Sequence, residues 1–354
     1  LTLTGPTITT PVDNGNGTFT FSGLSAGDYT VTATDTNNCT STPTEIEQTL
    51  SQPVQLDVTA TSQDISCFGS FDGSIIVENY NAVYTYILTN TAGPPTPING
   101  SVQGTDFVYN NLQAGNYKLE ASVAGNNGAI CRLDTFLNIN EPTLITLASS
   151  QVSTFNAGTG GDINISCNGG NDGGISITPT GGTGNYAYAW TTVDGNIPVG
   201  TETNQNLEDL TAGTYTVQVS DSNSCIQSFE FTLVEPRVLS NTVVVTQDNE
   251  CFQGLNGSIT SNILNGGSVD GIEYTYTIRG TPALPGSYPS IQTTTDLFAT
   301  FNNLPSGSFV VEVEDDNLCS TESSSVTLSQ PSDPIEVIAN VSDFNGFQIE
   351  CFGD

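Results

Sequence analysis

The stretch "LTAGTYTVQVSDSNSC", residues 210–225, decides the fold because the chain repeats it. Copies begin at Leu24 ("LSAGDYTVTATDTNNC") and Leu304 ("LPSGSFVVEVEDDNLC"), and a looser copy begins at Leu112 ("LQAGNYKLEASVAGNNGAIC"). Each copy has the form L-x-[AS]-G-x-[YF]-x-[VL] and is followed by a cysteine. One unit that recurs at a nearly fixed period is the signature of a tandem-repeat protein.

The residues after the glycine have the period of a half-buried β-strand. Tyr215, Val217 and Val219 alternate with polar residues, and residues 309–314 alternate in the same way. A period of two with one apolar face predicts a strand packed against a second sheet. About seven such strands per repeat predict an immunoglobulin-like β-sandwich, in which the aromatic after the glycine fills the core as in a tyrosine corner.

Three further signals give the boundaries of the repeat. An acid or Gln precedes each of four prolines, and a strand-like run and then a cysteine follow. After Cys67, Cys167 and Cys251, Asp or Asn comes five residues later and Gly six residues later. The Asp-Gly or Asn-Gly pair predicts a tight hairpin turn in which the glycine has a positive φ. We expect a piece of a longer array, with these domains: a partial repeat (1–53), three repeats (54–142, 143–236 and 237–331) and the start of another (332–354).

The short connections predict the arrangement of the modules. Little except Pro236 separates two repeats, and proline is stiff, so we expect an all-β chain of immunoglobulin-like modules arranged end to end as a rod. The first strand of a module, residues 54–67, is expected to run the length of that module, because a strand of this length spans roughly 46 Å.

The composition excludes several functions. The net charge is -33, from 37 acidic and four basic residues, whereas nucleic acid and anionic membranes need a basic surface. No apolar run is long enough to predict a membrane span, and the first residues do not predict a signal peptide. The sequence has no His, no G-x-S-x-G motif and no P-loop, and its acids are scattered, so we do not expect an enzyme.

The combined motifs resemble the SprB repeat, which fills the giant gliding-motility adhesins of Bacteroidota. The resemblance rests on C-x-G-x-x-D-G-x-I, "GGTGNYAYAW" (181–190), the 210–225 stretch and a final "EP". Only repeat 143–236 has the full motif, since repeat 54–142 lacks the GGTG and the tryptophan, and repeat 237–331 has Gln253 in place of the first glycine. The resemblance implies type IX secretion, an extracellular location at the cell surface in association with the outer membrane, and partners in the motility and secretion machinery.

The function expected from the resemblance and the near-uniform modules is structural. The chain would be a shaft segment of a very large secreted filamentous adhesin, transmitting force in adhesion and gliding. Its partners would be further copies of the repeat in the same chain, while other parts of the parent protein would bind a surface or polysaccharide. The alternative is a repeat array that itself binds polysaccharide or a partner cell. Tyr186, Tyr188 and Trp190 could stack on sugars, but their alternate spacing favours core packing.

The eight cysteines recur in register with the repeat and not in metal-binding clusters, which predicts disulfides and an oxidising, extracellular location. The sandwich topology places the cysteine after the first strand and the cysteine after the "AGxYxVxV" strand at opposite poles, too far apart to bond within one repeat. The expected bonds therefore join neighbouring repeats: Cys67–Cys225 and Cys167–Cys319, with Cys39, Cys131, Cys251 and Cys351 bonded outside the segment. The alternative pairing lies within repeats: Cys67–Cys131, Cys167–Cys225 and Cys251–Cys319.

Calcium is the one cofactor that the sequence leaves open. A D-x-N pattern precedes three of the cysteines, and calcium takes clustered carboxylate and carbonyl oxygens. The same pattern forms an Asx turn, and repeat 54–142 has no acid at this place. The calcium candidates are Asp35, Asn37, Asp221, Asn223, Asp315 and Asn317.

Overall fold

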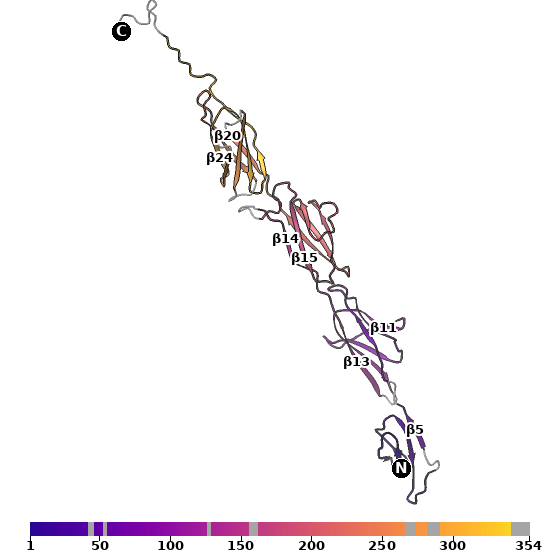
Figure 1. Ribbon diagram of the computed structural model, residues 1–354. Helices are drawn as coiled ribbons and strands as arrows, with labels where there is room; N and C mark the ends of the chain where they lie inside the picture. The colour runs from indigo at the N-terminus through magenta and orange to yellow at the C-terminus, as the bar shows by residue number, and fades with distance from the viewer. Residues whose placement is uncertain are drawn as a thin grey trace, which may run out of the picture. The chain divides into compact units, whose positions relative to one another are not determined.

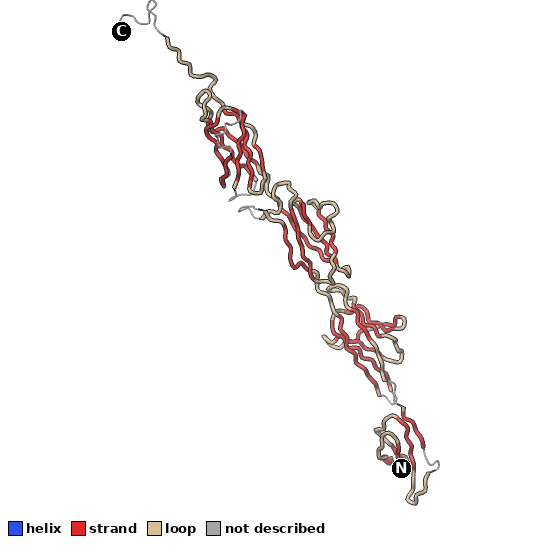
Figure 2. The backbone as a smooth tube through the Cα atoms, viewed as in Figure 1, coloured by secondary structure: helices blue, strands red, loops and turns tan. Residues whose placement is uncertain are grey.

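The computed structural model describes residues 1–41, 46–51, 55–125, 129–155, 162–266, 273–281 and 291–340. These residues form strands and loops without a helix (Figure 1; Figure 2), so none of the described residues belongs to a helix able to cross a membrane. The chain divides into two compact units, Leu1–Glu141 and Pro142–Asp354.

The first unit begins with a partial sandwich. Its central strand, β4 (Gly27–Thr32), lies between β1 (Thr2–Thr4) and β5 (Ile46–Leu50), and β2 (Val12–Asp13) pairs with β3 (Phe19–Thr20).

Repeat 54–142 completes the first unit with two four-stranded sheets. Its strands are β6 (Ala60–Gln63), β7 (Gly73–Val77), β8 (Thr85–Asn90), β9 (Pro97–Ile98), β10 (Ser101–Gln103), β11 (Asp106–Leu112), β12 (Gly115–Ala124) and β13 (Ile130–Ile139). The sheet orders are β10-β11-β7-β6 and β13-β12-β8-β9. Lettered along the chain, with β9 as C′, these orders are D-E-B-A and G-F-C-C′, which is the arrangement of an immunoglobulin-like sandwich.

The second unit contains two more sandwiches on the same plan. Repeat 143–236 has the sheets β14-β15-β17 (A-B-E) and β16-β18-β19 (C-F-G), and repeat 237–331 has β20-β21-β24 (A-B-E) and β23-β22-β25-β26 (C′-C-F-G), with β27 also paired to β25. The strands of the first are β14 (Thr146–Val152), β15 (Gly173–Thr180), β16 (Ala187–Thr192), β17 (Leu207–Leu210), β18 (Gly213–Ser220) and β19 (Ile226–Leu233). Those of the second are β20 (Ser240–Gln247), β21 (Gly257–Asn265), β22 (Tyr274–Thr281), β23 (Ile291–Thr294), β24 (Phe298–Leu304), β25 (Gly307–Asp315), β26 (Ser320–Glu322) and β27 (Val326–Leu328). The all-β, tandem immunoglobulin-like fold class is thereby confirmed, while the rod and the domain boundaries stay predictions.

Each complete repeat has one apolar core, to which the F strand contributes every second residue. Tyr215, Val217 and Val219 on β18 are fully buried, as the alternation predicted, and residues 309, 311 and 313 on β25 are buried in the same way. Burying an apolar side chain of this size stabilises a fold by about 1.5–3 kcal/mol. Trp190 lies in the core of repeat 143–236, and Tyr186 and Tyr188 pack half-buried against it, which confirms their interpretation as packing residues.

The recurring phrase builds a tyrosine corner. The hydroxyls of Tyr29, Tyr117 and Tyr215 each donate to the backbone carbonyl four residues earlier, at 2.9, 2.9 and 2.7 Å. Phe309 takes this place in repeat 237–331 and fills the core without the hydrogen bond. The phrase is therefore structural, because it fixes the entry into the central strand of the sheet.

A β-bulge precedes the phrase in every complete repeat and was not predicted. The residue before its leucine has a left-handed backbone at Asn111, Asp209 and Asn303 (φ 58, 56 and 61), and the E–B strand pairing shifts register there. Gly23 holds the same conformation in the partial repeat. Gly, Asn and Asp are the residues that tolerate positive φ, so their recurrence before the leucine was the available signal.

The predicted Asp-Gly hairpin turn is wrong. The positive φ lies earlier, at the second residue after the cysteine: Gly69, Gly169 and Gln253 (φ 77, 76 and 57). Gly173 instead begins β15, where a Cβ would lie 2.5 Å from Ile165 Cδ1. Glycine is required there by close packing and not by a turn.

The predicted long first strand is also wrong. In repeat 54–142 it is the four-residue β6, because the chain then leaves β7 to pair with the end of the last strand. Ile65 N donates to Asn140 O at 3.0 Å, and Ile165 N makes the equivalent bond to Val234 O at 3.2 Å. The change of partner carries the chain from one sheet toward the other before it reaches the cysteine.

Candidate functional site: a disulfide joint between repeats

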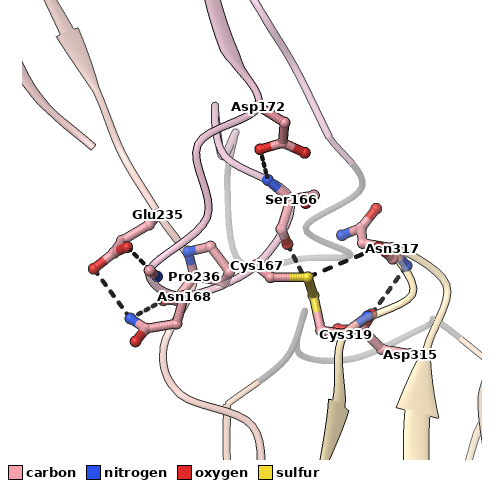
Figure 3. The surroundings of a disulfide bond; sticks show 10 residues. Ser166, Cys167, Asn168, Asp172, Glu235, Pro236, Asp315, Asn317 and Cys319 are labelled. Atoms are coloured by element: carbon pink, nitrogen blue, oxygen red, sulfur yellow. Dashed lines mark hydrogen bonds between the residues drawn. A yellow bond between two sulfur atoms is a disulfide. The ribbon is translucent and has the colours of Figure 1, made fainter. Parts of the chain in front are cut away.

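A disulfide bond joins two neighbouring repeats of the second unit. Cys167 lies in the loop between β14 and β15 of repeat 143–236, and Cys319 lies between β25 and β26 of repeat 237–331 (Figure 3). Their Cα atoms are 5.5 Å apart, within the range that a disulfide needs. The bond closes a loop with a sequence separation of 152 residues. In the chain-entropy description, a loop of this length stabilises the folded state by about 5 kcal/mol.

Side chains from both ends of repeat 143–236 hold the turn at Cys167. The Asp172 carboxylate accepts the backbone N–H of Ser166 at 3.0 Å, and Glu235 accepts the backbone N–H of Gly169 at 2.6 Å (Figure 3). Glu235 also accepts the side-chain amide of Asn168 at 3.1 Å. The cysteine is therefore fixed by an acid five residues after it and by the acid before Pro236.

The same hydrogen bonds recur in the other two complete repeats. Glu141 accepts the N–H of Gly69 at 2.6 Å, and Gln330 accepts the N–H of Gln253 at 2.9 Å. The "EP" or "QP" pair was interpreted only as a boundary signal, and its acceptor role was missed. Glu and Gln share a side-chain oxygen at the same reach, which explains why both occur before the proline.

An Asx turn presents Cys319 to the joint. Asp315 Oδ1 accepts the backbone N–H groups of Asn317 and Cys319, each at 3.0 Å, and Leu318 between them has a left-handed backbone (φ 65). Asn38 and Ser224 occupy the position of Leu318 in other copies with similar angles. The Leu318 side chain is 74% exposed, so no packing in the repeat compensates for its unfavourable conformation.

The joint is closely packed. Cys319 is only 8% exposed, and Cys167 packs against the apolar core of the following repeat. Cys319 Sγ lies 3.1 Å from the carbonyl oxygen of Ser166, and Cys167 Sγ lies 3.9 Å from that of Asn317. A disulfide sulfur carries no hydrogen, so these are packing contacts that leave little room for a reductant.

The structure excludes the within-repeat pairing. Cys167 is bonded to Cys319, which removes Cys167–Cys225 and Cys251–Cys319, and Cys131 is an exposed free thiol, which removes Cys67–Cys131. The bond between Cys167 and Cys319 is the one expected between neighbouring repeats.

The other cysteines divide into bonded and free groups. Cys67 and Cys225 are not free thiols, and their pairing with each other stays a prediction. Cys39 and Cys251 are exposed free thiols, as is Cys131, so their bonding outside the segment stays a prediction; Cys351 lies outside the described residues.

The calcium candidates form Asx turns. Asp35 and Asp221 accept the N–H of the Asn two residues later and of the cysteine four residues later, in the same way as Asp315. Burial alone would raise the pKa of Asp221, but hydrogen bonds from the backbone of Cys225 and Thr183 lower it below its usual value. The carboxylate oxygens thus serve backbone donors, and the described part of the chain holds no cluster of three or more His, Cys, Asp or Glu able to bind a metal. Calcium stays an untested expectation.

Comparison with protein families confirms the resemblance found in the sequence. The family model described as the SprB repeat matches residues 59–93 and 164–195. Each segment contains the cysteine turn, the B strand that follows it and the C strand of a complete repeat. With the tandem immunoglobulin-like fold, the match supports a repeat region of a surface adhesin. A comparison with curated proteins gives no match.

Solved structures of similar form are multi-domain proteins. Titin domains A168–A170 are 11% identical, with 77% of this chain and 98% of that chain covered and a TM-score of 0.26. The C-terminal 282-residue fragment of intimin, solved with a receptor domain, is 12% identical over 56% and 70%, with a TM-score of 0.28. The mouse nectin-like molecule 4 ectodomain is 9% identical over 79% and 96%, with a TM-score of 0.25. At these scores the whole-chain likeness supports no argument, and the fold rests on the strand orders above.

Proposed function

We propose that the chain is a shaft segment of a large secreted filamentous adhesin, in which disulfide-joined modules transmit force during adhesion and gliding. The observation that carries the proposal is the bond between Cys167 and Cys319, which links one repeat covalently to the next at a point other than the backbone. The cysteine turn and the cysteine-bearing Asx loop recur along the chain, so the same joint can be formed repeatedly. The SprB resemblance adds type IX secretion and outer-membrane association to the proposal.

The cysteine positions suit a mechanical role. Force that enters repeat 143–236 through its first strand reaches Cys167 and passes through the sulfur atoms to Cys319. The covalent connection gives the force a second route between the two repeats, beside the backbone at Pro236. A module that served only to display a binding face would not need this second connection.

The function can be tested on intact cells that produce the protein. An antibody to repeat 143–236 should label the outside of these cells, and beads carrying it should stay tethered when an optical trap pulls on them. Antibody absorbed beforehand with the purified chain is the control. Label confined to the cell interior or to the culture medium would contradict the proposal. Saturable binding of the purified chain to a polysaccharide, competed by the free glycan, would support the binding-array alternative instead.

A further inference from the structure

The turn at Cys251 has the geometry of the turn at Cys167 but is unoccupied by a partner cysteine. In both turns the third residue after the cysteine donates its N–H to the cysteine carbonyl, at 2.9 Å for Gly170 and 3.0 Å for Gly254. Asn256 accepts the N–H of Glu250 at 3.2 Å, as Asp172 does at the first turn. Cys251 is an exposed free thiol.

A hollow adjoins this free thiol. It has a volume of about 270 Å³ and is lined by residues 250–252 of the turn and by the segment after the last strand. Ile335, in that segment, is 92% exposed. The lining residues are Glu250, Cys251, Phe252, Pro331, Asp333, Pro334 and Ile335.

The chain also contains an unused copy of the loop that fills the Cys167 turn. In the occupied joint that loop is residues 315–319. At residues 35–39 the same acceptor pattern recurs, with Asp35 Oδ1 bonded to the N–H of Asn37 at 2.9 Å and of Cys39 at 2.8 Å. Asn38 has the left-handed backbone found at Leu318, and Cys39 is exposed and free.

We propose that the Cys251 turn is a binding site for a D-x-N-x-C loop of another repeat, and that it accepts the 35–39 loop of a second copy of this chain. The inference rests on the proposed function and names the partner that each joint recognises. The ordered loop seats its cysteine in the turn before the bond forms, so pairing depends on the Asx turn and not only on thiol exposure.

The covalent step is thiol–disulfide exchange with a low-molecular-weight disulfide as oxidant. The Cys39 thiolate attacks this disulfide, forming a mixed disulfide and releasing one small thiol. The Cys251 thiolate then attacks Cys39 Sγ and releases the second small thiol. Two cysteine thiols are oxidised, their protons are taken up by solvent or the leaving thiolates, and one disulfide is reduced.

The test uses the full chain with Cys351→Ser, as an equal mixture of ¹⁴N- and ¹⁵N-labelled protein in a glutathione redox buffer. Cross-linked peptides are quantified by mass spectrometry after digestion without reduction, and mixed-isotope pairs identify bonds between copies. We expect Cys39–Cys251 to exceed Cys39–Cys39, Cys251–Cys251 and every pair with Cys131 about tenfold. Cys131 is the internal control, because its thiol is exposed but no acid precedes it in an Asx turn.

Two variants separate recognition from reactivity. Asp35→Ala removes the acceptor of the loop and should reduce the Cys39–Cys251 yield about tenfold, whereas Asp28→Ala, which removes an exposed acid elsewhere in the partial repeat, should not. Gln330→Ala removes the acceptor that holds the turn at Gln253 and should also reduce the yield. Equal yields of all pairs, or an unchanged yield in Asp35→Ala, would overturn the inference. The Cys167–Cys319 peptide is measured in the same digest, so the inference can fail while the joint behind the proposed function remains intact.

Discussion

The joint predicts a large change in extensible length when one bond is reduced. Sulfur atoms connect residue 167 directly to residue 319, so tension applied at the chain ends does not pass along the backbone between them. The loop has a sequence separation of 152 residues. At about 3.3–3.6 Å per extended residue, this corresponds to roughly 500–550 Å of chain. The bond replaces that length with a Cα separation of 5.5 Å.

The assay is single-molecule pulling by the chain ends, in a variant whose cysteines other than Cys167 and Cys319 are Ser. The total contour length after complete unfolding should be about 500 Å greater with a reductant than without it. The further substitution Cys319→Ser should give the longer value under both conditions. An equal contour length in oxidised and reduced protein would refute the assignment of the joint. A difference well below this estimate would show that the bond closes a different loop.

Four further predictions concern residues that build the repeat and its joint. Tyr215→Phe should lower the free energy of unfolding by about 1–2 kcal/mol in chemical denaturation, because it removes the tyrosine-corner hydrogen bond and the bond that the hydroxyl accepts from the backbone N–H of Asn196 at 3.2 Å, whereas Tyr188→Phe should have little effect. Leu318→Asn should raise the free energy of unfolding by about 0.5–1 kcal/mol, because Asn tolerates the left-handed backbone better than Leu; a loss of stability would contradict this. Glu235→Ala should lower the free energy of unfolding by about 1–3 kcal/mol and speed the reduction of the adjoining disulfide, measured by thiol trapping, while Glu235→Gln should retain most of the stability. Since the folded pKa of Asp221 is lowered, its contribution to stability is present above the unfolded pKa and is lost as the pH falls through the folded value; Asp221→Asn should therefore flatten the decrease in melting temperature below about pH 4.

The fold was largely predictable because the same sequence pattern recurs several times along the chain. Alternating apolar residues on the F strand predicted the core, and the spacing between the glycine and the aromatic residue predicted the tyrosine corner. The bonded pair Cys167 and Cys319 followed from the position of each loop in a sandwich. These predictions succeeded because strand period and topology depend on local sequence and on few geometric alternatives.

The details of the joint were not predictable for a physical reason. Glu235 lies 66 residues from Gly169, whose N–H it accepts, and no local pattern shows that the two meet. Gly173 was interpreted as a turn glycine because Asp-Gly usually forms one, but a neighbouring side chain requires glycine there. The prediction of a long first strand failed for a similar reason, since a change of partner strand leaves the alternation of apolar and polar residues in the sequence intact.

The ring closed by Cys167 and Cys319 also determines how the protein tolerates damage. If a protease cuts one peptide bond between residues 168 and 318, the two fragments remain joined through the sulfur atoms, and the protein stays in one piece. Two events are needed to separate the part of the chain before Cys167 from the part after Cys319: a cut within the ring, and reduction of a disulfide in which Cys319 is only 8% exposed. A filament built from overlapping rings of this kind would stay continuous after an isolated cleavage in any one ring.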